Sequence, residues 1–351
     1  MNEVNATNPM LGIFLFMLGG LAGAVFYLPF SRVRKWAWES YWLIYALMGL
    51  VLAPWILAFT TAPNTLAVLQ AAPRQEIVYC LICGMLWGFG GLTWGLMIRY
   101  LGVGLGLAMG AGLTSAAGTL IPPMLKGSAA MAAMFHTPGG QMSVVAAAVS
   151  LVGIICVGLA GRSKEQELPE EEKKKTVAEF NFRKGMMAAI FSGLMSSAMS
   201  FGLQGGPGIQ KLALSTAPVT TITWAGIPVL VVVLMGGFVI NGGWCLVLNF
   251  RNRTAGDYVK PPVGNNLFFA SLAGVLWCLQ FVCFKTGEPS MGKTSYIGWA
   301  VLMAASILFS QLLGILLGEW KGTGRKTRGL LAAGLLLLIA SSVLAGYAGS
   351  L

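Results

Sequence analysis

The chain has 351 residues, of which 56% are hydrophobic and only 10% are charged. Soluble domains are about a quarter charged, so these few charges exclude a water-soluble fold of this size. The formal net charge of +11 is typical of nucleic-acid binding in other chains, but here the basic residues concentrate in short loops between apolar segments. The composition therefore predicts an all-α integral membrane protein with no nucleic-acid partner.

Apolar segments recur along the whole chain, and each approaches the length of about 20 residues that a membrane-crossing helix needs. The N-terminal stretch MNEVNATNPM lacks the basic region of a cleaved signal peptide, so the first apolar segment is expected to remain as a span. In chain order, ten transmembrane helices are predicted at residues 10–29, 39–60, 77–98, 103–125, 142–161, 185–204, 226–248, 265–284, 295–318 and 328–349.

Basic residues in the predicted loops alternate between the two sides of the membrane. Of the 23 lysines and arginines, one side holds eighteen: Arg32, Arg34, Lys35, Arg99, Arg162, Lys164, Lys173, Lys174, Lys175, Arg183, Lys184, Arg251, Arg253, Lys260, Lys321, Arg325, Lys326 and Arg328. The other side holds five: Arg74, Lys126, Lys211, Lys285 and Lys293. Because positive charge marks the cytoplasmic side, both termini are predicted to be periplasmic in a bacterial inner membrane.

An internal repeat is indicated on either side of the charged segment 162–184. GMLW at 84–87 recurs as GVLW at 274–277, and each copy has a glycine eighteen residues after its first glycine, at Gly102 and Gly292. Five spans is an odd number, so the second half must insert upside down relative to the first. We therefore expect two inverted five-helix repeats, residues 1–161 and 185–351, joined by a cytoplasmic linker, as in many secondary transporters.

The stretch FYLPFSRVRKWAWESYW, residues 26–42, places one carboxylate among aromatic and basic residues at the start of an apolar segment. On a helix, Trp38, Trp42 and Tyr45 share one stripe and Glu39 lies beside it. Burial among these rings would favour a protonated Glu39, whereas the preceding cations would favour its ionised form. Two readings stay open: Glu39 carries a proton during transport, or it forms a fixed salt bridge that braces the loop.

Polar residues inside the predicted spans are few, and none is a strong charge. This pattern disfavours an ionic substrate, because such a substrate would need a buried cation or anion as its partner. Amides and hydroxyls beside tryptophans suit a neutral, polyhydroxylated solute, although tryptophans at span ends also form interfacial belts and hydroxyls often bond to their own helix. The polar candidates are Thr93, Thr114, Ser196, Ser197, Ser200, Gln204, Asn241, Gln280 and Gln311; the aromatic candidates are Trp42, Trp87, Trp94, Trp224, Trp277 and Trp299.

Catalytic, metal and cofactor sites are not predicted. Cys80 and Cys83 form a CxxC without a second pair or a nearby histidine, so they are interpreted as small apolar residues within a helix. The glycines of GVGLGLAMGAGL, residues 102–113, have no strand before them and no GK[ST] after them, so they are interpreted as helix-packing positions. With one histidine and almost no intramembrane acids, a membrane-embedded enzyme is disfavoured.

Several blocks of the sequence resemble the L-rhamnose–proton symporter family of the drug/metabolite transporter superfamily. They are FYLPFSRVRKWAWESYW, LWGFGGLTWGLMIRYLGVGLGLAMGAGL, GTLIPP, EFNFRKG, SAMSFGLQ and LWCLQF, in order between about residues 10 and 320. The resemblance implies ten helices in two inverted repeats and proton-driven uptake of a 6-deoxy sugar. It also implies Glu39 as the proton-coupling residue, with Trp38, Trp42, Trp87, Gln204, Asn241, Trp277 and Gln280 as candidates for the substrate cavity.

The sequence departs from this family pattern in three places. Gly91 stands where an asparagine is expected and Trp94 stands where a tyrosine is expected, and Trp94 is retained as a substrate-binding candidate. The loop QGGPGIQKLALSTAP and the segment TSYIGWAVLMAASILFSQ are only loosely similar to the pattern. These departures bear on which sugar is carried more than on the fold or the coupling.

The leading hypothesis is therefore proton-coupled symport of L-rhamnose or a close deoxy sugar. The alternative on the same fold is an exporter or exchanger of another neutral metabolite. The coupling ion is predicted to be a proton, with sodium as the alternative, because carbonyls and hydroxyls can bind sodium without leaving a sequence signature.

Overall fold

The computed structural model describes residues 8–125, 132, 135–169, 171, 177, 179–291, 298–348 and 351, and within these ranges all regular structure is helical. The first half of the chain begins with α1 (Pro9–Val25) and the short η1 (Leu28–Arg32). The next segment runs through α2 (Trp38–Ala46), the π-helical η2 (Leu47–Leu52) and α3 (Ala53–Thr61). After them come α4 (Thr65–Ala71), α5 (Arg74–Leu101), α6 (Val103–Leu125) and α8 (Pro138–Glu167).

The second half begins with α10 (Phe182–Ser196) and α11 (Ala198–Gln204), which are separated only by Ser197. The short α12 (Pro207–Ala213) leads to α13 (Ile227–Arg251), η3 (Ala255–Val259) and α14 (Val263–Gly287). The last helices are α15 (Gly298–Leu316) and α16 (Arg325–Ala348).

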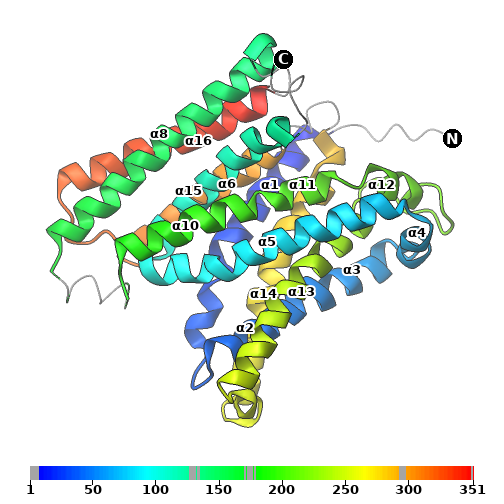
Figure 1. The fold of residues 1–351 in the computed structure, drawn as a ribbon, viewed down its shortest axis with the longest axis horizontal. Helices are drawn as coiled ribbons and strands as arrows, with labels where there is room; N and C mark the ends of the chain where they lie inside the picture. The colour runs from blue at the N-terminus through cyan, green and yellow to red at the C-terminus, as the bar shows by residue number, and fades with distance from the viewer. Residues whose placement is uncertain are drawn as a thin grey trace.

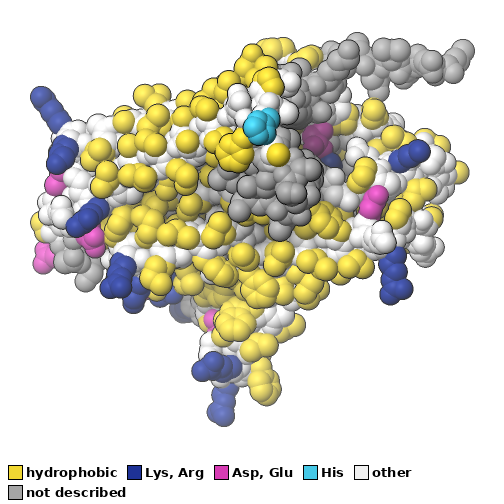
Figure 2. All heavy atoms as spheres, turned by 45° about the horizontal axis from the view of Figure 1, so that its top comes forward, with side chains coloured by type: hydrophobic (Ala, Val, Ile, Leu, Met, Phe, Trp, Pro, Cys, Tyr) yellow, Lys and Arg dark blue, Asp and Glu magenta, His cyan; other side chains and the backbone are white. Residues whose placement is uncertain are grey.

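Among the described residues, eight helical segments are long and apolar enough to cross a membrane, and two further apolar stretches, Val103–Gly118 and Val301–Leu316, are shorter. Many large hydrophobic side chains are exposed, including Phe14, Ile56, Phe268 and Leu336. Figure 2 shows such side chains over the middle of one face, with lysines and arginines toward its margins. This distribution suits a lipid environment, and the protein is a helical integral membrane protein.

Glycines let the helices around the centre approach closely. A Cβ on Gly84 of α5 would collide with the backbone of α13 at Val233 and Gly236. Likewise, a Cβ on Gly274 of α14 would collide with the backbone at Tyr45 and Gly49. The two GxLW sequences therefore lie where α5 and α14 pack closely against the backbones of their neighbours. At the side of the molecule α8 and α16 pack along each other (Figure 1).

Some local features differ from the sequence expectation. The helices α4 and α12 lie in regions predicted as connecting loops, and Ser197 interrupts the predicted segment 185–204. The predicted linker 162–184 begins as helix, because α8 continues to Glu167. Residues 170, 172–176 and 178 of that linker lie outside the described residues, as does Gly292 of the proposed repeat.

Candidate functional site

A small aromatic cavity lies at the centre of the helical assembly. Its lining includes Trp42 from α2, Trp87 from α5, Trp277 from α14, Trp299 from α15 and Leu107 from α6. The cavity volume is about 70 Å³, more than the roughly 10–15 Å³ that a single buried water needs.

Three polar groups at this cavity retain unused hydrogen-bonding capacity. The Ser196 hydroxyl and the Trp299 indole N–H are buried and have no hydrogen-bond partner among the described residues. The Gln280 amide also lines the cavity and makes no hydrogen bond within the described part of the chain. By contrast, the Thr114 and Ser306 hydroxyls donate to the carbonyls of Gly193 and Leu302. An incoming ligand with hydroxyl groups could therefore pair with the first three side chains.

Stacked tryptophans form much of the cavity wall. Trp87 and Trp277, the equivalent residues of the two GxLW sequences, stack with ring centroids 4.5 Å apart. Trp38 and Trp42 stack on one face of α2 with centroids 5.0 Å apart. These rings give flat apolar surfaces of the kind on which the C–H face of a sugar packs.

Asn241 of α13 fixes the position of Trp42. Its side-chain oxygen accepts a hydrogen bond of 3.0 Å from Trp42 Nε1, and its side-chain nitrogen donates to the carbonyls of Gly88 at 3.2 Å and Gly237 at 3.0 Å. Asn241 is 1% exposed and is not among the residues that line the cavity. Its amide therefore joins α2, α5 and α13 behind the wall that Trp42 forms.

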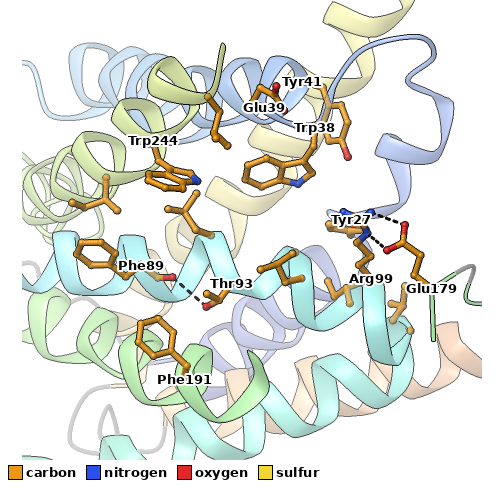
Figure 3. A pocket seen from close by; sticks show the side chains of 18 of the residues that line it. Tyr27, Trp38, Glu39, Tyr41, Phe89, Thr93, Arg99, Glu179, Phe191 and Trp244 are labelled. Carbon is orange, nitrogen blue, oxygen red and sulfur yellow. Dashed lines mark hydrogen bonds and ion pairs between the residues drawn. The ribbon is translucent and has the colours of Figure 1, made fainter. Parts of the chain in front are cut away.

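A much larger cleft of about 1190 Å³ lies between α2, α5 and α13. Figure 3 shows Trp38 and Trp244 on one side, with Phe89, Thr93 and Phe191 opposite them. Gly95 of α5 lines this cleft and faces the Trp38–Trp42 stack, because a Cβ at that position would lie 3.6 Å from Trp42. The same stack thus separates the cleft from the central cavity.

Glu39 lies in the first turn of α2, lines the large cleft and is only 6% exposed. One of its carboxylate oxygens accepts hydrogen bonds from Asn252 Nδ2 at 2.9 Å and Thr254 Oγ1 at 3.0 Å. None of the ion pairs within the described residues includes Glu39. Neutral groups therefore hold this carboxylate, in a position that water and protons can reach through the cleft.

Asp257 of η3 caps the start of the helix that carries Glu39. Its carboxylate accepts hydrogen bonds from the Ala37 backbone N–H at 2.7 Å, from Ser40 Oγ at 2.9 Å and from Lys260 Nζ at 2.7 Å. Burial opposes ionisation, but these three donors outweigh it and hold the pKa of Asp257 below its usual range. An ionised Asp257 thus satisfies donors in the first turn of α2, the turn that also carries Glu39.

The structure brings most of the predicted site residues to two neighbouring spaces. Five of them, Trp42, Trp87, Trp94, Trp277 and Gln280, line the central cavity. Trp38 and Glu39 line the large cleft.

The remaining two predicted residues lie elsewhere. Asn241 is behind the cavity wall, and Gln204 is exposed at the end of α11. Ser196 and Trp299 appeared among the polar and aromatic span residues, but nothing in the sequence showed that their donors would remain unpaired in the cavity.

A helical membrane protein with a central polar–aromatic cavity beside a wide cleft has the features of a small-molecule transporter. Comparison with known proteins gives the particular family. The model of the L-rhamnose-proton symport protein family matches residues 4–349, and the chain belongs to this family. The family is one of transport proteins, so the chain is a transporter rather than an enzyme.

Two curated relatives illustrate the similarity. A protein of Klebsiella pneumoniae named L-rhamnose-proton symporter is 30% identical over 344 residues, which cover 96% of this chain and 97% of the relative. A protein of Escherichia coli with the same name is 28% identical over the same shares of both chains.

Proposed function

We propose that this protein is a secondary active transporter that takes up L-rhamnose or a closely related deoxy sugar together with protons across the bacterial inner membrane. The observation that carries the proposal is the central cavity, where Ser196, Trp299 and Gln280 present unpaired polar groups between stacked indole rings. The symporter names of the relatives favour uptake over the export or exchange considered from the sequence.

A deoxy sugar matches the mixed chemistry of this cavity. Its hydroxyls would exchange hydrogen bonds with Ser196, Trp299 and Gln280, which have no competing partner among the described residues. Its apolar C–H face would pack on the Trp87–Trp277 stack, and its methyl group would find apolar contacts at Met199 and other lining side chains. Burying a hydroxyl without a partner is costly, so unpaired groups in the wall favour a hydroxylated ligand over an apolar one.

Glu39 is the proposed proton carrier. It lines the cleft, its partners are neutral, and it begins the helix that also carries the Trp38–Trp42 stack between the cleft and the cavity. A proton on Glu39 would remove the negative charge that the Asn252 and Thr254 donors stabilise. Proton binding would thereby change the contacts of α2, and with them the position of the wall of the sugar site.

The proposed architecture is ten transmembrane helices in two inverted five-helix repeats, residues 1–161 and 185–351. The helix contacts support this symmetry. In the first half α5 packs on α10 and α13, and its equivalent α14 packs on α1 and α2. Likewise α6 packs on α8 and α10, and its equivalent α15 packs on α16 and α1. Exchanging the halves thus exchanges one set of contacts for the other.

Hydrogen bonds between the halves support the same symmetry. Asp257, in the connection after α13, binds the N-terminus of α2. Asn64, in the connection after α3, binds Thr220 at 2.7 Å in the segment before α13. The two contacts involve equivalent segments of the proposed repeats, with the roles of the halves reversed.

The proposed orientation follows from the loop charges, which assign Arg99, Arg251 and Arg325 to the cytoplasm and both termini to the periplasm. The large cleft would then open toward the cytoplasm. In this orientation the wall that the Trp38–Trp42 stack forms separates the sugar cavity from the cytoplasmic cleft. Transport would require that wall to open to the cleft and the opposite end to open in the other half of the cycle.

Purified protein in proteoliposomes tests this function. With an inward proton gradient and no sodium, labelled L-rhamnose should accumulate above its external concentration, and a protonophore should abolish the accumulation. Accumulation that requires sodium would show that sodium, rather than the proton, is the coupling ion. Absence of both accumulation and exchange of L-rhamnose, in protein shown to be folded, would refute the proposed substrate.

A further inference from the structure

A second buried polar cluster lies away from the sugar cavity, where the ends of α6, α8 and α15 meet. Three of its side chains have buried polar atoms without a hydrogen-bond partner among the described residues: Lys164 Nζ, Gln311 Oε1 and Trp320 Nε1. These are three of the five such atoms in the described part of the chain. The cluster surrounds Glu319, which is 3% exposed and lines the same large cleft as Glu39.

Glu319 joins two helices that both contribute to the sugar cavity. Its two carboxylate oxygens accept hydrogen bonds from the backbone N–H groups of Val103 at 2.8 Å and Gly104 at 3.0 Å, at the start of α6. Gln311 of α15 donates its side-chain N–H to the Gly104 carbonyl. Further along, α6 supplies Leu107 to the cavity wall and α15 supplies Trp299, Met303 and Ser306.

Lys164 provides the positive charge of the cluster. Its side chain is fully buried, and its ammonium group lies 5.3 Å from the Phe180 ring centroid and 5.0 Å from that of Trp320. It interacts electrostatically with Glu319. Burial raises the pKa of the Glu319 carboxyl, and the Lys164 charge and the two backbone N–H groups oppose this rise without cancelling it.

Apart from the half-buried Glu165 of α8, the other charged groups on the neighbouring elements are engaged elsewhere or exposed. Glu167 of α8 accepts hydrogen bonds from Gly324 and Thr327 at the start of α16. Arg99 of α5 pairs with Glu179. Lys321, in the same turn as Glu319, packs along Gly318 and is exposed. The basic residues that begin α16, Arg325, Lys326 and Arg328, are exposed as well, as is Arg162 of α8.

We propose that Glu319 is a second proton-binding group of this transporter, which takes up a proton from the cleft in the conformation seen here, and that Lys164 sets the pH at which the proton leaves. The chemistry of the cluster selects a proton over other ions. Two backbone N–H groups and an ammonium group would repel a metal cation, whereas the carboxylate would repel an anion. A proton on Glu319 also supplies an O–H donor beside Gln311, whose oxygen lacks one.

The role of this proton in transport rests on the proposed function, but proton binding itself does not. Because Glu319 holds the start of α6 against α15, its protonation would alter the contact between two walls of the sugar cavity. Glu319 is therefore a positioning residue for the sugar site as well as a proton site. It lies on a different wall of the cleft from α2 and Glu39.

Infrared titration of the protonated carboxyl C=O band, without sugar, tests the proposal. The measurement uses full-length protein carrying Glu39→Gln, so that the other buried carboxylate of the cleft does not contribute. Glu179 also lines the cleft, but it is exposed and pairs with Arg99. We expect a band that persists to higher pH than the band of exposed carboxyls. Adding Glu319→Gln should remove it, and adding the matched exposed change Glu171→Gln should leave it intact.

The variant Lys164→Gln gives an independent test, because the band should persist to higher pH in it rather than disappear. Loss of the ammonium charge should stabilise the protonated carboxyl and shift the band's midpoint to higher pH. An unchanged band in Glu319→Gln, or a midpoint in Lys164→Gln that stays in place or falls, would overturn the proposal. Should Glu319→Gln fail to fold, the direction of the Lys164→Gln shift decides. Failure of L-rhamnose transport would refute the proposed function. It would not affect the infrared titration, which is done without sugar and tests proton binding alone.

Discussion

The hydrogen bond between Trp42 and Asn241 offers a quantitative test of how the cavity wall is held. Replacing Asn241 by leucine keeps a similar side-chain shape but removes the acceptor of the buried Trp42 N–H. Interhelical hydrogen bonds in membrane proteins contribute about 0.6 kcal/mol on average and up to about 1.7 kcal/mol. The unpaired indole N–H adds a desolvation cost of about 1–3 kcal/mol. Asn241→Leu should therefore lower the free energy of unfolding by roughly 1–3 kcal/mol.

A double-mutant cycle isolates the contact itself. In a Trp42→Phe background there is no N–H to pair, so Asn241→Leu should cost about 0.6–1.7 kcal/mol less than it does alone. The assay is the free energy of unfolding by SDS titration in mixed micelles, with L-rhamnose affinity measured in parallel. Strict additivity of the two changes would refute the role of this hydrogen bond. A loss of sugar affinity by Asn241→Leu that is equally large in the Trp42→Phe background would instead indicate direct contact between Asn241 and the sugar.

Three further predictions use matched residues or a pH profile. Ser196→Ala should weaken L-rhamnose binding, measured as the calorimetric Kd, about five- to tenfold, which is the effect of one lost hydrogen bond. Ser306→Ala should change this Kd little, because the Ser306 hydroxyl already bonds its own helix. Equal effects of the two changes would contradict the proposed site. Gln280→Ala should weaken binding and Gln204→Ala should not, because only Gln280 lines the cavity; a larger loss with Gln204→Ala would exclude this cavity. Asp257 has a lowered pKa, so the stability that its cap contributes is present at neutral pH and is lost as pH falls through that pKa. Asp257→Asn should therefore flatten the acid side of the plot of Tm against pH. An unchanged plot would be inconsistent with the cap.

Apolar segments of the sequence predict the helices well, because lipid requires each spanning backbone to satisfy its own hydrogen bonds. The start of α2 at Trp38 and the placement of Glu39 beside stacked tryptophans agree with the helical spacing read from residues 38–45. Local interruptions were not predicted. The π-helical stretch Leu47–Leu52 lies just before Pro54, whose missing N–H cannot continue the α-helical hydrogen bonds. At the other break, the Ser197 hydroxyl donates to the Leu194 carbonyl of its own helix.

The partners of the site residues could not be predicted, because they come from distant parts of the chain. The sequence left two roles open for Glu39, a proton carrier or a salt bridge with nearby cations. Its hydrogen-bond partners are instead Asn252 and Thr254, more than 200 positions later in the chain. Gln204 and Gln280 look equivalent in sequence. Only the three-dimensional arrangement shows that one is exposed at a helix end and the other faces the cavity.

The external pH of a weakly buffered, de-energised suspension of cells that express this protein is the most direct test of sugar–proton symport through Glu39. Adding L-rhamnose should make the medium transiently alkaline, because each sugar that enters carries a proton with it. Glu39→Gln should abolish this alkaline shift but retain exchange of labelled L-rhamnose across the membrane, since the cavity is unchanged. An alkaline shift of the parent's size in Glu39→Gln, with both proteins present at equal amounts in the membrane, would contradict the coupling role of Glu39.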